Sequence, residues 1–170
     1  MSDKRDATYW IDALGLKPHP EGGWFAESFR SSVSISKDAL PRDFSGDRSM
    51  ATAIHFLLSG KSVSHFHRIQ SDEMWHFYTG SPLTVHVIDH MGVLFHIKLG
   101  SNPDAGEQFQ GLVKAGCWFG ASLEDVEGYA LVGCTVSPGF DFADFEMASR
   151  SDLLASFPEY EDTIKLLTQP

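Results

Sequence analysis

Residues 60–80 read GKSVSHFHRIQSDEMWHFYTG, and they place two histidines and a glutamate at a specific spacing. His65 and His67 are two residues apart, so on a β-strand both imidazoles are expected to face the same side of the sheet. Glu73 follows after five residues, which lets the chain reverse and bring a carboxylate beside them. Imidazole nitrogen and carboxylate oxygen are ligands that Zn²⁺, Fe²⁺, Mn²⁺ and Ni²⁺ accept. The spacing therefore predicts a metal or polar-ligand site formed by His65, His67 and Glu73.

The sequence on both sides of this stretch alternates between apolar and polar residues, which is typical of β-strands. Turn residues separate the alternating segments, as at His90-Met-Gly92, where the glycine can adopt a positive φ in a tight hairpin. Short strands with helices only at the ends favour an antiparallel sandwich or barrel over alternating βαβ units. We expect strands at residues 24–31, 51–58, 73–78, 83–89, 93–99, 109–114 and 129–136.

Helices are expected at both ends of the chain. Residues 6–16 have apolar side chains at helical spacing, and residues 151–167 read as two short helical pieces, with Ser151 as a cap and Pro158 starting the second. Polar residues 33–48 predict a long surface loop, which is either a lid or a mobile segment. We therefore expect a single domain, with a helix and turn at residues 1–20, a barrel at 21–148 and a helical tail at 149–170.

The composition excludes several classes of protein. The chain has 170 residues and is 42% hydrophobic, which suits one core. It has 13 basic and 23 acidic residues, and a net charge of -10 repels nucleic acids and anionic membranes. No apolar run approaches the roughly 20 residues that cross a bilayer, and residues 1–6 lack the apolar run of a secretory signal. Two cysteines make a disulfide framework unexpected, so we expect a cytoplasmic protein with no nucleic-acid or membrane partner.

The residue order at 65–80 resembles the first sequence signature of the cupin superfamily: His-x-His, five residues, Glu, six residues, Gly. Gly60 stands one residue closer to the first histidine than in that signature. The second signature, Pro-x-Gly-x-x-His, aligns with residues 114–119, where Lys114 replaces the proline and Phe119 stands at the position of the fourth metal ligand. Phenylalanine cannot coordinate a metal. The resemblance implies a mainly β fold, a double-stranded β-helix or jelly-roll barrel, with short N- and C-terminal helices.

A closer resemblance extends over almost the whole chain. It rests on residues 10–27, which include the run PHPEGGWF, and on residues 53–58, 115–120 and 136–146. These segments resemble an uncharacterised cupin family of bacteria and fungi, whose members are similar in fold to the sugar-nucleotide epimerase, or RmlC-like, cupins. The resemblance implies the architecture and a homodimer that pairs through sheets and N-terminal strands. It implies no particular reaction.

Candidate site residues extend beyond the two histidines and the glutamate. Glu21 and Glu27 lie where the N-terminal turn enters the first strand, so either could reach the barrel mouth as an acid or base, and Tyr78 is a further candidate proton donor. Strict alternation puts Trp75 and Phe77 on the face of Glu73, and His76 and Tyr78 on the other. The candidates for ligand binding are His55, Trp75, His76, Phe77, Trp118 and Phe119.

Three functions fit these residues. The first is binding of a small polar or anionic metabolite, such as a sugar or nucleotide derivative, with isomerase or epimerase chemistry. In that case His65 or His67 is the base, Glu73 orients it, and Tyr78 or Glu21 returns the proton. The second is a dioxygenase or isomerase that depends on a divalent transition metal (Zn, Fe, Mn or Ni). The third is a non-catalytic ligand-binding or sensor module.

Overall fold

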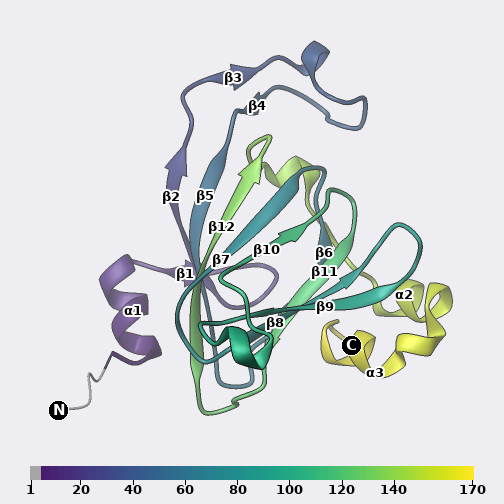
Figure 1. Ribbon diagram of the computed structural model, residues 1–170. Coiled ribbons are helices and arrows are strands. Elements are labelled where there is room, and N and C mark those ends of the chain that lie inside the picture. The colour runs from purple at the N-terminus through teal and green to yellow at the C-terminus, as the bar shows by residue number, and fades with distance from the viewer. Residues whose placement is uncertain (1–4) are drawn as a thin grey trace.

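Two antiparallel sheets face each other as a jelly-roll barrel in the computed structural model, which describes residues 5–170 (Figure 1). This mainly β architecture confirms the predicted fold class. Residues 1–4, which make up most of the segment considered above for a secretory signal, lie outside the described residues. One sheet has the order β1 (Lys17–Pro18), β2 (Trp24–Arg30), β5 (Thr52–Ser59), β12 (Tyr129–Ser137), β7 (Asp72–Gly80) and β10 (Gln110–Val113). The other has the order β13 (Glu146–Met147), β6 (Ser64–Arg68), β11 (Trp118–Leu123), β8 (Leu83–Ile88) and β9 (Leu94–Leu99).

Side chains between the two sheets form the main core, and strand β7 shows how the sequence builds it. Glu73, Trp75 and Phe77 alternate along β7 and are all buried, whereas Tyr78 is 53% exposed. The predicted alternation along this strand is therefore confirmed. Strands β8 and β9 pair as the predicted hairpin, and Gly92 in their turn has a φ of 77°.

Helix α1 (Ala7–Leu14) lies on the outer face of the six-stranded sheet. Asp6 caps its first turn with a side-chain hydrogen bond, and Gly15 ends the helix in the left-handed conformation, with a φ of 61°. Apolar side chains of the helix pack with Leu57 of β5 and Leu131 of β12. Among residues 5–170, no helix combines the length and the apolar composition needed to cross a bilayer.

The C-terminal segment covers the outer face of the five-stranded sheet. It consists of α2 (Arg150–Ser156), the 3₁₀ turn η4 (Pro158–Tyr160) and α3 (Glu161–Leu166). Pro158 begins the second piece as predicted, but the cap of the first is Ser149, so the predicted cap at Ser151 is wrong by two residues. The buried residues between this segment and the sheet are Phe66, Ile88, Leu153, Ile164 and Leu167.

Residues 31–50 form an arm with its own small hairpin instead of an open loop. Its strands are β3 (Ser34–Ile35) and β4 (Arg48–Ser49), with a 3₁₀ turn η1 (Lys37–Ala39) between them. Figure 1 shows the arm reaching beyond the ends of β2 and β5. Arg48 is buried and donates two hydrogen bonds, 2.6 and 2.7 Å long, to Asp144 in η3 (Phe142–Asp144). This ion pair joins the arm to the segment that follows β12. A further 3₁₀ turn, η2 (Pro103–Ala105), precedes β10.

Candidate functional site

A β-bulge in β6 decides which histidine faces the interior of the barrel. Phe119 of β11 pairs with His67, but Ala121 pairs with Ser64. The paired residues are two positions apart on β11 and three apart on β6, so β6 contains one extra residue between them. His67 and Ser64 are consequently both buried. Gly120 permits the bulge, because a Cβ atom there would lie 2.6 Å from Ser64 O. The expectation that His65 and His67 share one face is therefore wrong, since the bulge breaks the alternation between them.

His65 holds the N-terminal turn that delivers Glu21 to the barrel. Its backbone N–H and its ring Nδ1 each lie 2.7 Å from the carbonyl oxygen of Glu21. The next two residues are Gly22 and Gly23, with φ of 103° and 72°, and a side chain at Gly22 would collide with Val63 O. The turn therefore fits against β6 only with glycine there, and His65 acts on the backbone of Glu21 and does not line the cavity.

Glu21 is the centre of a buried polar cluster. Its Oε2 lies 3.1 Å from Nε2 of His67 and 3.4 Å from Nδ1 of His19. Its Oε1 accepts a 2.9 Å hydrogen bond from the hydroxyl of Ser64. Three side chains, two from β6 and one from the turn that contains Glu21, thus converge on one carboxyl group.

The hydrogen bonds around His67 place one proton between it and Glu21. Nδ1 of His67 lies 2.7 Å from the carbonyl oxygen of His65, and because a carbonyl only accepts, this nitrogen holds a proton. In a neutral imidazole Nε2 is then an acceptor, so its contact with Glu21 requires either a protonated carboxyl or an imidazolium ring. In both cases the pair shares one proton that can move along a single hydrogen bond.

Burial shifts the protonation equilibria of the site toward neutral pH. It raises the pKa of Glu21 to about 7, against the opposing influence of His19 and of the Ser64 hydrogen bond. Burial also raises the pKa of Glu73 to about 7, where His67 opposes the shift and Glu21 adds to it. Burial lowers the pKa of His67. These shifts favour a protonated carboxyl with a neutral imidazole, and both carboxyl groups exchange protons near pH 7.

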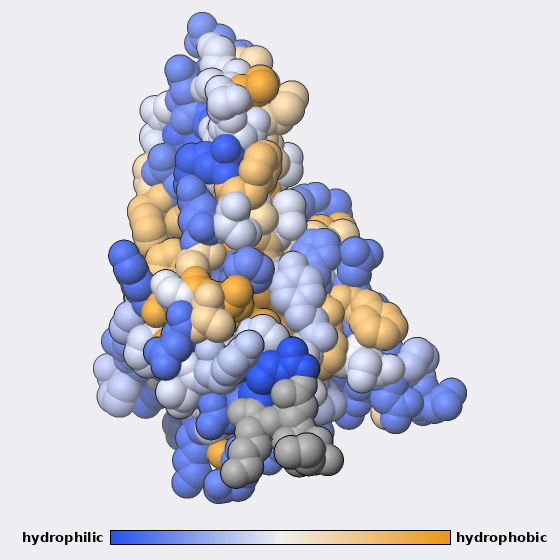
Figure 2. All heavy atoms as spheres, turned by 90° about the vertical axis from the view of Figure 1, so that its left-hand side faces the viewer, coloured by the Kyte–Doolittle hydropathy of each residue, from blue (hydrophilic) through white to orange (hydrophobic). Residues whose placement is uncertain are grey.

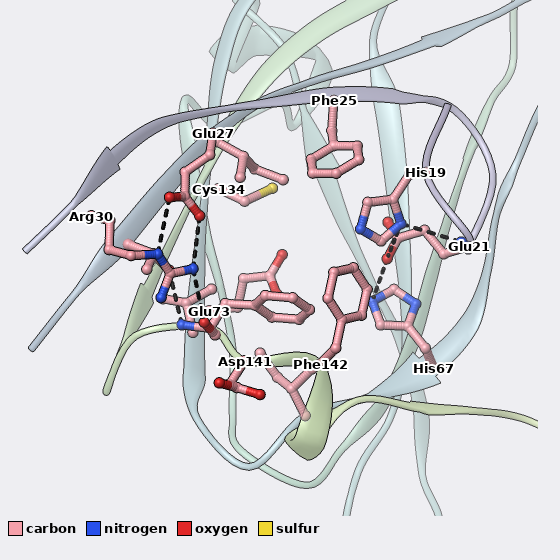
Figure 3. A pocket seen from close by; sticks show the side chains of 15 residues that line it. His19, Glu21, Phe25, Glu27, Arg30, His67, Glu73, Cys134, Asp141 and Phe142 are labelled. Carbon is pink, nitrogen blue, oxygen red and sulfur yellow. Dashed lines mark hydrogen bonds and ion pairs between the residues drawn. The ribbon is translucent and has the colours of Figure 1, made fainter. Parts of the chain in front are cut away.

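A cavity of about 270 Å³ opens beside this cluster. Figure 3 shows His19, Glu21 and His67 on one side of it and the ion pair of Glu27 with Arg30 on the other. The volume is at the lower end of the range for small-molecule sites. Glu73 and Cys134 also line the cavity, and the thiol of Cys134 is hydrogen-bonded to Glu73. The apolar part of the lining consists of Phe25, Ile54, Ile69, Val136, Phe140 and Phe142.

Three of the predicted aromatic residues face the interior but belong to the core. Trp75, Phe77 and Phe119 are buried and lie outside the cavity lining. The Phe119 ring packs against His67, with 4.2 Å between the ring centroids. Phe119 therefore supports the ring of His67 from the position at which the cupin signature has a metal ligand.

Four other candidates lie on the outer faces of the sheets, which corrects their expected place in the site. His55 and Tyr78 contact each other edge to face beside helix α1. His76 is hydrogen-bonded to Thr135 on the outer face of the same sheet. Trp118 lies under the guanidinium of Arg68, 4.4 Å from its ring centroid. The physical reason is alternation, because each of these side chains points away from the inward-facing neighbours on its strand.

The predicted metal ligands do not fit a metal ion. His65 is turned toward the backbone of Glu21, so it does not join His67 and Glu73 at one point. Among residues 5–170, no group of three or more His, Cys, Asp or Glu side chains is arranged to hold a metal ion. Of the three predicted ligands, the structure brings only His67 and Glu73 to the cavity.

Sequence reasoning missed several residues of the cavity. His19 and Arg30 flank the turn that contains Glu21, so the run from Pro18 to Arg30 was the available signal. Glu27 was the alternative to Glu21 as an acid or base in the sequence, and it does line the cavity. Asp141 and Phe142 come from the loop after β12, which no spacing in the sequence connects to the turn.

The two facing sheets and the polar cavity between them define a cupin-type barrel. The chain belongs to the family described as Cupin superfamily (DUF985), whose model matches residues 8–148. No curated protein sequence matches the chain significantly.

Solved structures agree with this family assignment. Protein SO0799 from Shewanella oneidensis is 41% identical, with a TM-score of 0.86 over 97% of this chain and 98% of that one. A hypothetical protein from Leishmania major is 35% identical, with a TM-score of 0.87 over 97% and 99% of the two chains. Oxalate decarboxylase from Bacillus subtilis is 14% identical, with a TM-score of 0.54 over 88% of this chain and 36% of that one. The last likeness concerns the fold alone.

Proposed function

We propose that the cavity is the active site of an isomerase- or epimerase-type enzyme, which moves a proton on a small polar metabolite of about the size of a sugar. The observation that carries the proposal is the buried Glu21–His67 pair, which shares one proton and lines the same cavity as Glu73. Abstraction of a proton next to a carbonyl needs a base and an acid that both work near neutral pH. Carboxyl groups with a pKa of about 7 meet that need.

In the proposed reaction, ionised Glu73 removes a proton from the carbon next to the substrate carbonyl. The electron pair of that C–H bond moves to the carbonyl oxygen and forms an enolate. In an epimerisation, protonated Glu21 then donates its proton to the same carbon from the opposite side as the carbonyl re-forms. In an isomerisation, Glu21 donates to the former carbonyl carbon instead, while the hydroxyl proton of the neighbouring carbon moves to the former carbonyl oxygen, so that the carbonyl forms at the neighbouring carbon. His67 supports Glu21 through their shared hydrogen bond. The reaction leaves Glu73 protonated and Glu21 ionised. Proton exchange with water, or a turnover in the reverse direction, returns both groups to their starting protonation states.

His19 is suited to stabilise the enolate oxygen. Its Nδ1 accepts a 3.2 Å hydrogen bond from the backbone N–H of Glu21, so in the neutral ring the proton lies on Nε2. Burial lowers the pKa of His19, which keeps the ring neutral. A neutral imidazole N–H that lines the cavity can donate to an oxygen on which negative charge develops.

The roles differ from those expected from the sequence. Glu73 is the proposed base and Glu21 the proposed acid, whereas His65 positions the turn and Tyr78 lies on the outer face. His67 keeps a place in the site as the hydrogen-bonding partner of Glu21.

The test is wash-in of solvent deuterium into candidate substrates. The protein is incubated in D₂O with a panel of aldoses, ketoses and their phosphates, and proton NMR follows the C–H signals next to each carbonyl. We expect loss of one such signal, slowed by at least about 100-fold in Glu73→Gln and in Glu21→Gln. Glu127→Gln, an exposed carboxyl outside the cavity, is the matched control and should leave the rate unchanged.

Two outcomes contradict the enzyme proposal. Binding of a panel compound with no deuterium exchange would make the cavity the site of a ligand-binding module. Exchange that survives in both Glu73→Gln and Glu21→Gln would show that other groups move the proton.

A further inference from the structure

We propose that this cavity admits neutral and cationic ligands and excludes anionic ones, including phosphorylated sugars and nucleotide derivatives. The inference rests on the proposed function, because it specifies the charge of the substrate for the same site. Of the polar or anionic metabolites expected from the sequence, it keeps the polar ones and excludes the anionic ones.

Carboxylates outnumber free cations at the mouth of the cavity. Glu27 and Arg30 are 41% and 44% exposed, which places their pair at the mouth, together with exposed Asp141. Arg30 donates two hydrogen bonds to Glu27, of 2.9 and 2.7 Å, and a third to the carbonyl of Phe140. Its charge is therefore already neutralised by Glu27, and Asp141 leaves an excess of one negative charge.

A second arginine near Asp141 is also paired. Arg48 is close enough to Asp141 for the two charges to interact, but it is bound through two hydrogen bonds to Asp144. A phosphate could reach the N–H pairs that hold Glu27 and Asp144 only by displacing one of these carboxylates. Such an exchange gains little, because a charge-assisted bidentate pair is lost for each one formed.

The interior of the cavity adds negative potential and no fixed positive charge. Glu21 and Glu73 each contribute a negative charge when they ionise, while burial keeps His19 and His67 neutral. An anionic ligand would therefore meet like charge both at the mouth and inside. A hydroxylated neutral molecule or an amine meets hydrogen-bond acceptors in both places.

The size of the cavity supports the same inference. The volume of about 270 Å³ is near the lower limit of the range of roughly 300–1,000 Å³ for small-molecule sites. It suits a sugar-sized ligand better than a nucleotide with its base, ribose and phosphates. A nucleotide derivative would leave most of its charged part at the acidic mouth.

The cavity contains its own probe of electrostatic potential, the thiol of Cys134. Three methanethiosulfonate reagents of similar size, with a trimethylammonium, a sulfonate or an uncharged end group, are reacted with the protein at low ionic strength. Each rate is divided by the rate of the same reagent with 2-mercaptoethanol. Peptide mass spectrometry separates modification of Cys134 from that of Cys117, which does not line the cavity.

We expect the corrected rate of the cationic reagent to exceed that of the anionic one by at least about tenfold. The ratio should shrink severalfold in the Glu27→Gln, Asp141→Asn double variant and at 0.15 M salt, where charges are screened within about 8 Å. Equal corrected rates, or a faster anionic reagent, would overturn the inference. None of these readouts requires turnover, so they are independent of the deuterium experiment.

Discussion

Glu21 and Glu73 become candidate proton carriers because of where their side chains lie. Each is buried, so its charged form loses hydration, and the pKa of each rises to about 7. The surroundings nevertheless differ. Glu21 has three side-chain partners, whereas Glu73 is hydrogen-bonded to the thiol of Cys134. Two similar carboxyl groups can therefore take different roles in one cavity.

These raised pKa values predict how stability depends on pH. A carboxyl with a raised pKa binds its proton more tightly in the folded state, so its contribution to stability is present below about pH 4.5 and is lost as the pH rises through about 7. The loss for Glu21 is about 3 kcal/mol in the free energy of unfolding. Urea denaturation at about pH 5 and about pH 8 measures it.

The matched variants are Glu21→Gln and Glu127→Gln. The first should reduce the decrease in stability between the two pH values without abolishing it, because glutamine does not ionise whereas Glu73 still titrates at about 7. The second removes an exposed carboxyl and should leave the decrease as it is in the wild type. An equal decrease in all three proteins would show that Glu21 does not titrate in this range.

At the residue scale the sequence identified part of the site. Glu21, His67 and Glu73 were all predicted and all line the cavity. His65 was misplaced because a β-bulge depends on the register with another strand, which the spacing within one strand does not contain. His19 was missed because a single histidine in a proline-rich turn has no periodic pattern.

At the scale of elements, strand β6 depends on Gly120 of the neighbouring strand. A methyl group at that position would press on Ser64 O and Phe66 N, at 2.6 and 3.2 Å. We therefore expect Gly120→Ala to lower the free energy of unfolding by about 1–3 kcal/mol. Gly46→Ala is the control, since no atom would lie closer than 3.5 Å to its new methyl group. Equal stability of the two variants would contradict this account of the bulge.

Elements with strong alternation were predictable, and elements fixed by tertiary contacts were not. Strand β7 alternates strictly between buried and more exposed residues, and its position follows from the sequence. Strand β11 begins Trp118-Phe-Gly-Ala, which has no polar residue to mark its outward face, and it was not predicted as a strand. Residues 33–48 of the arm were expected to form a loop, because the short hairpin there depends on contacts such as Arg48 with Asp144, which the local sequence does not reveal.

At the scale of the whole molecule, the ion pair of Arg48 with Asp144 joins the arm to the segment that borders the cavity. Both side chains are 5% exposed. Arg48→Met leaves the Asp144 charge buried without a partner, and we expect a loss of about 3–5 kcal/mol in the free energy of unfolding. The double variant Arg48→Met, Asp144→Leu should recover most of this loss in urea denaturation. A double variant as unstable as the single one would show that packing, not the unpaired charge, causes the loss.

The homodimer implied by the family resemblance remains a prediction at this scale. Light scattering coupled to size-exclusion chromatography should give twice the 18.8 kDa mass of one chain. A mass equal to that of one chain at micromolar concentration would contradict it.

The topology of the barrel, by contrast, came from the cupin signatures, because alternation alone does not order the strands within the two sheets.

The central claim is that two buried carboxyl groups of one cavity titrate near pH 7, with Glu21 sharing its proton with His67. A ¹³C NMR titration of the glutamate side-chain carboxyls in the wild type and in Glu21→Gln tests it most directly. We predict that two of the nine glutamates titrate at about 7 in the wild type and that one does so in the variant. Titration of every glutamate near its ordinary value of 4.5 would contradict the claim.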